Sequence, residues 1–407
     1  MIVKNEEENL PRCLRSVQGI VDEIVIVDTG STDRTVEIAN EFGAKVSSRE
    51  WDEDFAAARN TALDGATGEW ALVMDADEEL VGEDVETLRS LLEDGEHAGF
   101  FFSVISLPKE APYMENAVIN PSIRLFRNLA QHRYAGIVHE QVQIPPQNGQ
   151  VAVVPVRLRH YGYSALPEGQ AKTRKRNTEL LTKAIAKHPD DAYVHYCLGK
   201  EQMGEGRHAE ALVSFSRSRE LLPEVTPMYA GPLLRNLALC YKETGRIAEA
   251  LQVLAEGQQQ FPDYTDLPYL EGIIYISVGE PRAALDSFER CFLLGDPPAQ
   301  YNTWGGVAGY GAYRGLGVAY RALNDEPNAL QAFYDALQDN PRDVYSLVQT
   351  GEMLLKHESP AQIRSYLEGL VDMSSPEILE ALAYVYRQTG HEKIASDYEK
   401  KREKLVT

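Results

Sequence analysis

The chain has 407 residues and a net charge of −22 at pH 7, with 43% hydrophobic and 25% charged residues. This composition is typical of globular proteins with two or more domains, and the negative charge argues against nonspecific binding to nucleic acid or anionic lipid. The sequence has no apolar stretch of membrane-spanning length, and its four cysteines form no CxxC metal or redox pattern. We therefore expect a reduced, cytoplasmic protein.

Short apolar runs alternate with helical patterns through the first 165 residues. Such an alternation of strand and helix predicts a mostly parallel, doubly wound α/β sheet. The expected elements, in chain order, are a helix over 6–18, a buried strand over 24–27, helices over 33–42 and 55–65, and strands over 70–74, 99–107 and 151–159.

Two carboxylates, Asp75 and Asp77, follow the strand expected over 70–74. Alternate residues of an extended chain share a face, so both side chains can point the same way where the strand ends. Because ligands of open α/β sheets bind outside the carboxyl ends of the strands, the pair could hold a divalent cation. The same residues could instead form an acidic turn, since carboxylates also favour the start of a helix.

After residue 165 the β-type pattern ends and a repeated pattern begins. The segment 206–212 recurs at 245–251 and at 279–285, and in several copies a small residue stands four positions before an aromatic one. The pattern resembles the tetratricopeptide repeat, a pair of antiparallel helices about 34 residues long. An array of such pairs offers a groove for an extended peptide or a protein surface, or an arm for dimerisation.

Four segments of the first part, in this order, resemble the successive motifs of family 2 glycosyltransferases with the GT-A fold. The chain is also similar to bacterial members in which this fold is joined to tetratricopeptide repeats, some of which glycosylate peptides or proteins. Relatives usually carry several apolar residues before the first motif, so we expect this chain to begin inside its first strand. The four segments are residues 1–7, 27–35, 54–60 and 74–78.

The resemblance implies three parts of the chain. A GT-A catalytic domain with a Rossmann-like, mostly parallel sheet would occupy residues 1–165. A linker helix would follow over 166–189, and an all-α tetratricopeptide-repeat solenoid over 190–407.

The resemblance also implies a metal ion, Mn²⁺ or Mg²⁺, which would act as a Lewis acid on the leaving diphosphate. Asp77 would bind it directly, and Asp75 would contact it through water or contact the ribose instead. His160 would complete the metal shell, with His139 as the competing candidate. Further contacts to the nucleotide sugar are expected from Glu6, Glu7, Asp28, Asp54, Arg59, Arg124 and Arg127.

An inverting transfer requires a carboxylate opposite the leaving group to accept the proton of the acceptor. Glu140 is the first candidate for this base, and Glu79, beside the metal motif, is the second. Strand alternation adds a constraint on the arginines, because only one of Arg124 and Arg127 can easily face the site.

The expected reaction is therefore the transfer of a hexose from a nucleoside-diphosphate sugar, by resemblance a UDP sugar, to a peptide or protein held by the repeats. One alternative is an acceptor of the cell envelope or a lipid-linked sugar, with the repeats serving to dock or to form a homodimer. The other is a repeat scaffold without activity. The intact motif residues count against the scaffold, and the acidic composition counts against a membrane-bound acceptor.

Overall fold

The computed structural model describes residues 1–107, 117–162 and 167–406. The chain folds into two compact units, of which the first comprises Met1–Gly245 and Ala299–Thr303, and the second Arg246–Pro298 and Trp304–Thr407. The domain boundary predicted at residue 165 lies outside the described residues and stays a prediction.

The first unit begins with a parallel sheet of three strands, in the order β1-β2-β3. Its centre is β2, where Ile26 and Val27 are fully buried, as expected for the apolar run that ends at Asp28. Helices on this sheet bury Leu10 and Ile38 against the strand. The elements are β1 (Ile2–Val3), α1 (Leu10–Ser16), β2 (Val25–Asp28), α2 (Thr35–Glu41), β3 (Lys45–Ser48) and α3 (Phe55–Gly65).

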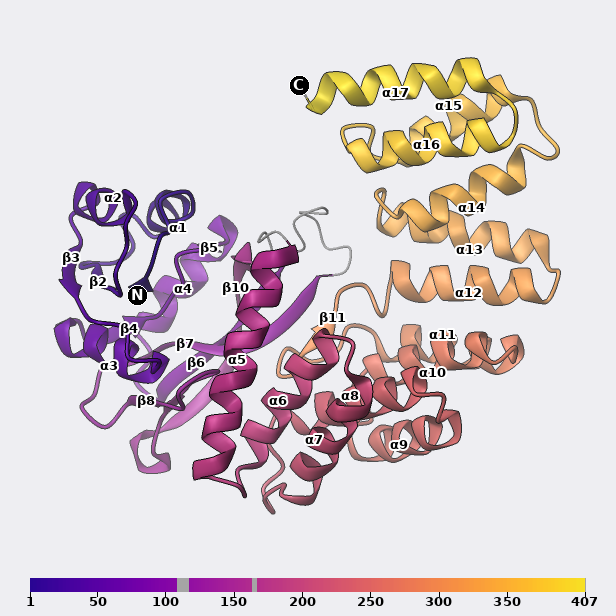
Figure 1. The fold of residues 1–407 in the computed structure, drawn as a ribbon. Coiled ribbons are helices and arrows are strands. Elements are labelled where there is room, and N and C mark those ends of the chain that lie inside the picture. The colour runs from indigo at the N-terminus through magenta and orange to yellow at the C-terminus, as the bar shows by residue number, and fades with distance from the viewer. Residues whose placement is uncertain (108–116, 163–166, 407) are drawn as a thin grey trace. The chain divides into compact units, whose positions relative to one another are not determined.

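A second sheet of six strands has the order β11-β7-β6-β10-β5, with β4 paired to β7 (Figure 1). Strands β6 and β10 are parallel, whereas β4, β5 and β7 pair antiparallel with their neighbours, so this sheet is mixed. The α/β class is confirmed, but parallel pairing covers only part of the domain. The strands are β4 (Trp70–Leu72), β5 (Glu78–Leu80), β6 (His97–Ser106), β7 (Val118–Arg127), β10 (Gln150–His160) and β11 (Thr303–Trp304).

Smaller elements complete this part of the chain. A hairpin joins β8 (Arg133–Ala135) and β9 (Gln141–Gln143), and its turn includes residues 136–140. Helix α4 (Val85–Leu92) covers one face of the second sheet and buries Leu88 in the same core as Phe100. Two short 3₁₀ helices are η1 (Gly82–Asp84) and η2 (Pro146–Asn148).

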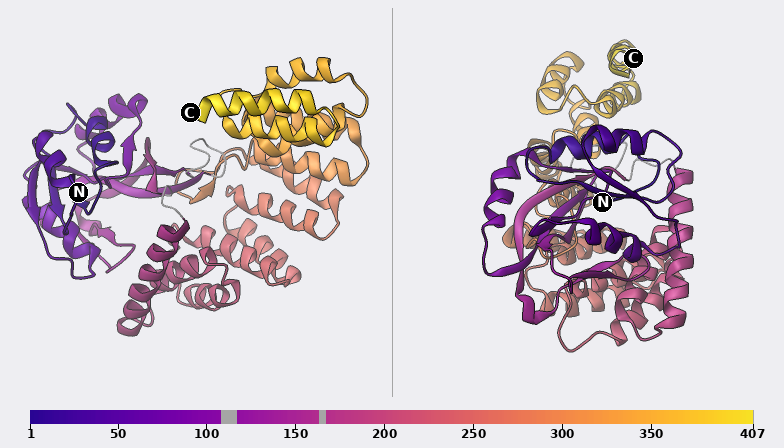
Figure 2. Two further views of the ribbon diagram at one scale, coloured as in Figure 1. Left: turned by 45° about the horizontal axis from the view of Figure 1, so that its top comes forward. Right: turned by 90° about the vertical axis from the view of Figure 1, so that its left-hand side faces the viewer.

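The first unit also contains the helices α5 (Pro167–Lys187), α6 (Ala192–Gly204), α7 (His208–Glu220) and α8 (Ala230–Glu243). The second unit is helical, and the left view of Figure 2 shows its helices stacked on one another. They are α9 (Ile247–Gln260), α10 (Asp266–Ser277), α11 (Pro281–Leu294), α12 (Tyr310–Ala322), α13 (Glu326–Asp339), α14 (Val344–Leu354), α15 (Pro360–Leu370), α16 (Pro376–Gln388) and α17 (Glu392–Val406).

The repeated small and aromatic residues have a packing explanation. A Cβ on Gly199 of α6 would lie 2.5 Å from the Phe215 ring of α7, so only glycine lets the two helices approach this closely. The same arrangement recurs in the second unit, where a Cβ on Gly272 would lie 2.7 Å from Phe288. The helix pairs expected from the repeats are thus present. Among the described residues, no helix combines the length and the apolarity needed to cross a membrane.

The second sheet takes its edge strand from inside the helical region, which the sequence did not predict. Residues Ala299–Thr303 follow α11 but belong to the first unit, and β11 lies next to β7. Nearby, the Asn302 side-chain amide donates to the carbonyl of Ile119 at 3.3 Å. The buried Arg235 of α8 donates in turn to Asn302 Oδ1 at 2.7 Å, so a repeat helix also supports this edge.

Candidate active site

The pairing of β10 with β5 brings two of the predicted metal ligands together. In this antiparallel register His160 lies opposite Glu78, and the Tyr161 amide donates to the carbonyl of Asp77 at 2.9 Å. As a result His160 Nε2 lies 3.3 Å from Asp77 Oδ2, and the two side chains stay 26% and 22% exposed. The other ring nitrogen, Nδ1, lies 3.2 Å from Ser106 Oγ on β6, which fixes the orientation of the ring.

The charge around His160 favours its protonated form in the absence of a metal. Burial lowers the pKa of the imidazole, but the hydrogen bond to Asp77 and the neighbouring carboxylates Glu78 and Asp75 more than offset this effect. The net result is a pKa above the ordinary histidine value. The site is therefore rich in negative charge, as a cation-binding site requires.

Asp77 and His160 could bind a metal ion that is also coordinated by a bound substrate. Within residues 1–107, 117–162 and 167–406, no group of three or more His, Cys, Asp or Glu side chains is arranged to hold a metal ion. Asp77 and His160 supply one oxygen and one nitrogen donor, a combination that suits Mn²⁺ better than Mg²⁺. The other positions would have to come from diphosphate oxygens and water, as is usual for a nucleotide-bound metal.

Gly162 provides the space beside Asp77 and His160. A Cβ at this position would overlap Asp77 Oδ2 and would lie 2.5 Å from His160 Nε2. We expect Gly162→Ala to push the two donors apart and to weaken Mn²⁺ binding in the presence of UDP by about tenfold. Titration calorimetry would measure this, with Gly82→Ala as the control because a Cβ at Gly82 meets no neighbour within 4 Å. Equal Mn²⁺ affinity in both variants would contradict the assignment.

Asp75, which lies two residues before Asp77, belongs to a buried network of charges. Arg59 of α3 donates from Nη2 to Asp75 Oδ1 at 2.8 Å and from Nε to Glu140 Oε1 at 2.5 Å. Arg124 of β7 donates to Glu78 Oε1 at 2.5 Å and lies 3.5 Å from Asp75 Oδ2. Two arginines and three carboxylates thus meet in one place.

Asp75 is held in its charged form by this network. Burial would raise the pKa of its carboxyl group, but Arg59 and Arg124 hold it well below its usual range. Both oxygens of Asp75 face arginines, whereas Asp77 faces His160. The two carboxylates of the motif therefore have different surroundings, although one residue separates them.

Glu78 is a member of the site that the sequence analysis missed. Its side chain is 1% exposed, and its Oε2 accepts a hydrogen bond from the Asp75 amide at 2.9 Å. Burial raises its pKa above the ordinary value even though Arg124 acts in the opposite direction. A signal was present, because strand alternation places Glu78 on the same face as the buried Leu80.

The first loop and the end of β2 contribute the residues expected around the nucleoside. Asp28 is buried, and its Oδ2 and Oδ1 accept from the amides of Gly30 and Ser31 at 3.1 Å each. Glu6 lies close enough to Asp77 to be affected by it, since burial and the neighbouring carboxylates raise its pKa. Glu7 instead is exposed and accepts from the Arg34 amide at 3.1 Å.

Two predicted contacts have partners away from the charge network. Asp54 is the N-cap of α3 and accepts from the Ala57 amide at 2.9 Å. Arg127 pairs with Glu69 and its guanidinium lies 4.0 Å from the centre of the Trp70 ring. Alternation along β7 thus turns Arg124 towards the network and Arg127 away from it.

The remaining candidates also have defined partners. His139, the competitor of His160, lies 3.0 Å from Glu201 Oε1 on α6. Glu79 accepts from the Tyr161 hydroxyl at 2.6 Å, while Glu140 is bound to Arg59. The structure thus brings Glu140 into the charge network and leaves His139 facing a repeat helix.

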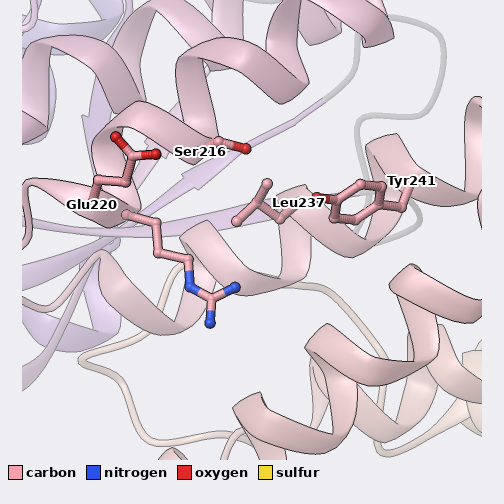
Figure 3. Close-up of a pocket in the computed structure, with 5 residues that line it drawn as sticks. Ser216, Glu220, Leu237 and Tyr241 are labelled. Atoms are coloured by element: carbon pink, nitrogen blue, oxygen red, sulfur yellow. The ribbon is translucent and has the colours of Figure 1, made fainter.

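A separate pocket lies between α7 and α8 (Figure 3). None of the predicted site residues lines it. Figure 3 shows side chains from both helices around it, and its lining consists of Ser216, Arg219, Glu220, Leu237 and Tyr241.

Comparison with known proteins gives one family for the first part of the chain. Residues 1–140 match the family model described as "Glycosyl transferase family 2". The structure of a tetratricopeptide repeat protein from Parabacteroides merdae aligns over 59% of this chain and 91% of that protein, with 17% identity and a TM-score of 0.40.

Several sequence relatives cover part of the chain. A TPR repeat-containing protein of Synechococcus elongatus is 38% identical over 260 residues, which are 62% of this chain and 63% of that protein. The SPbeta prophage-derived glycosyltransferase SunS of Bacillus subtilis is 28% identical over 211 residues, 49% of this chain and 48% of that protein. An uncharacterized glycosyltransferase of Rickettsia typhi is 42% identical over 83 residues, 20% of this chain and 28% of that protein. The chain thus spans less than two thirds of the length of each of these relatives.

Proposed function

Because residues 1–140 match the family model of glycosyl transferase family 2, we propose that this protein transfers a sugar from a nucleoside-diphosphate sugar to an acceptor. The observation that carries the proposal is the meeting of Asp77 and His160, 3.3 Å apart, beside the charge network around Asp75. We further propose that the donor is a UDP-hexose and that the transfer inverts the anomeric centre.

Asp77 and His160 are the proposed protein ligands of Mn²⁺ or Mg²⁺. When bound, the metal would neutralise the charge that develops on the leaving diphosphate. Asp77 supplies the anionic ligand, and His160 must lose its proton before it can bind. Ser106 holds the imidazole through Nδ1, which leaves Nε2 directed at Asp77 and available to the metal.

Asp75 is better suited to the ribose than to the metal in this arrangement. Its two oxygens already face Arg59 and Arg124, so it cannot turn towards a cation without breaking buried ion pairs. Arg59 Nη1 and Arg124 Nε are buried and have no hydrogen-bond partner among the described residues. A buried N–H group without a hydrogen-bond partner destabilises the fold. An oxygen of the bound nucleotide sugar would accept a hydrogen bond from such a group.

Glu140 is the proposed proton acceptor, with Glu79 as the second candidate. Arg59 binds Glu140 Oε1 through its Nε, which fixes the carboxylate beside Asp75 and orients it for proton transfer. Glu79 Oε2 accepts a hydrogen bond from the Tyr161 hydroxyl, and its side chain lies on the opposite face of β5 from Glu78.

The proposed acceptor is a peptide or protein that the helical repeats recruit. The support is the repeated helix pairs, because such arrays commonly present a surface for another polypeptide. The same surface could join two copies of the chain, which we propose as the second use of the repeats.

A screen of donors would test the proposed function. UDP-glucose, UDP-galactose, UDP-N-acetylglucosamine and GDP-mannose would each be added with and without MnCl₂. A donor at a hundred times its Kd should stabilise the protein by about 2.7 kcal/mol and raise its Tm. We expect the Tm to rise with a UDP sugar and only when MnCl₂ is present. Slow hydrolysis of the sugar nucleotide should release UDP under the same conditions. If no sugar nucleotide shifts the Tm and none is hydrolysed, the proposal is wrong.

A further inference from the structure

A buried carboxylate on a repeat helix binds the loop that carries Glu140. Glu201 lies on α6, is 6% exposed, and places its Oε1 3.0 Å from His139 Nε2. The same oxygen accepts from Asn177 Nδ2 of α5 at 2.9 Å, and Arg174 Nη1 lies 3.6 Å from the other oxygen. Glu201 therefore joins α5 and α6 to residues 136–140.

These partners keep Glu201 charged. Burial raises the pKa of its carboxyl group, but the hydrogen bonds from His139 and Asn177 and the charge of Arg174 lower it by more, so the net pKa lies below the ordinary value. A buried charge is stable only when it is paired and hydrogen-bonded. The contact with His139 is thus one of the interactions that make the burial of Glu201 possible.

The loop itself has an uncommon backbone and needs external support. His139 has a φ of +52° and Gly136 a φ of +100°. The left-handed region is uncommon for a residue that carries a Cβ, so surrounding contacts must hold His139 there. One is the hydrogen bond from the Phe55 amide to the carbonyl of Ile137, at 3.1 Å. The other is the hydrogen bond between His139 Nε2 and Glu201 Oε1.

The adjacent residue of the loop leads directly into the charge network. Glu140 binds Arg59 Nε at 2.5 Å, and Arg59 binds Asp75 at 2.8 Å. His139 and Glu140 therefore connect a repeat helix on one side with the proposed nucleotide-sugar site on the other. A shift of this loop would move Glu140 and would leave Arg59 with a single carboxylate partner.

Helix α5 meets the same region at a further point. On α5, the Arg176 guanidinium lies 5.1 Å from the centre of the ring of Phe55, the first residue of the helix that carries Arg59. All these residues belong to the first compact unit.

We propose that Glu201 is a positioning residue for the transfer reaction: by holding His139 it fixes residues 136–140 and places Glu140 and Arg59 for catalysis. The role in transfer rests on the proposed function, whereas the hold on the loop does not. The first repeat then forms part of the catalytic apparatus and does more than recruit an acceptor.

The test compares two neighbouring buried residues of α6. Glu201→Met removes the carboxylate at nearly constant size. Gln202→Met is the matched control, because Gln202 is also buried but accepts from Ser214 Oγ of α7 at 2.7 Å and does not contact the loop. Both variants lose a buried hydrogen bond on the same helix. Glu201→Gln keeps an acceptor oxygen for His139 and should restore the contact in part.

Hydrogen exchange of peptides covering residues 133–143 gives a readout that needs no substrate. We expect Glu201→Met to speed exchange there by about tenfold, while Gln202→Met leaves it unchanged. Release of UDP from the donor identified in the screen gives the second readout. Glu201→Met should lower kcat by about tenfold with little change in the KM for the donor, and Gln202→Met should change neither.

Additivity provides a further check on the pair. Because His139 and Glu201 would act as one unit, the double variant His139→Ala/Glu201→Met should lose no more kcat than Glu201→Met alone. Unchanged loop exchange in Glu201→Met would overturn the hold on the loop, and faster exchange with an unchanged kcat would overturn the positioning role. If the wild-type protein turns over no sugar nucleotide, the proposed function fails, while the exchange experiment still decides whether Glu201 holds the loop.

Discussion

Asp77→Ala should lower the metal-dependent turnover of the donor by about 10³-fold and leave the fold intact. The Asp77 side chain is 22% exposed, and its partner His160 keeps its contact with Ser106 after the change. The free energy of unfolding should therefore change little. The loss falls on the reaction, because His160 alone would remain as the protein ligand of the metal. Release of UDP, measured with MnCl₂ and with EDTA, gives the rate.

Asp64→Ala provides the control for this variant. Asp64 is also a carboxylate of the first unit, but it is 67% exposed and pairs with Arg133 at the surface. Its removal should alter neither the turnover nor the response to MnCl₂, because exposed ion pairs contribute little. A rate near that of the wild-type protein in Asp77→Ala would remove Asp77 from the metal site.

Arg124→Met should destabilise the first unit by about 3–5 kcal/mol, because it leaves Glu78 buried without its counter-charge. Glu78 is 1% exposed and lies 2.5 Å from the Arg124 guanidinium, so water cannot replace the lost partner. Asp75 would also lose one of its two arginines. For a unit of this size the Tm should fall by roughly 10 °C, which thermal unfolding followed by circular dichroism would measure.

A second arginine on the same strand is the natural control. Arg127 is three residues away on β7, but its partner Glu69 is 77% exposed. Arg127→Met should therefore cost only about 1 kcal/mol. The double variant Glu78→Met/Arg124→Met should regain much of the stability that Arg124→Met loses, since no unpaired charge is then buried between them. Equal losses in Arg124→Met and Arg127→Met would show that the network is not buried as described.

Local sequence patterns were enough to predict several of these elements. The apolar run before Asp28 forms the buried centre of the first sheet, because hydrophobic residues in a continuous run suit a strand that is covered on both faces. Alternation along β7 correctly predicted that only one of Arg124 and Arg127 faces the site. Residues an odd number of positions apart in a strand point to opposite faces. The recurrence of segment 206–212, with a small residue four positions before an aromatic one, likewise predicted the helix pairs.

Other features depend on contacts between distant segments, which a local pattern does not contain. Nothing in the sequence around Thr303 shows that β11 joins the second sheet beside β7. The antiparallel pairing of β5 with β10 is also a long-range choice of register, and it alone brings His160 to Asp77 and makes Gly162 necessary. The partner of His139 is likewise set by the docking of α6.

Glu78 differs from these cases because its burial was predictable. An acidic run suggests a solvated turn, whereas alternation along β5 places Glu78 on the same face as the buried Leu80. The structure shows that β4 ends at Leu72 and that a separate strand, β5, begins at Glu78 and buries the charge against Arg124. Carboxylates that follow a strand end therefore need to be assigned by face, one residue at a time.

Titration of UDP into the protein, once with MnCl₂ and once with EDTA, tests the central claim most directly. The claim is that Asp77 and His160 hold a metal together with the diphosphate of the donor. We expect binding in MnCl₂ that weakens by at least about a hundredfold in EDTA, and the same weakening in Asp77→Ala with MnCl₂ present. The claim would be contradicted if the wild-type protein bound UDP equally well in MnCl₂ and in EDTA, and if Asp77→Ala bound UDP as tightly as the wild-type protein does.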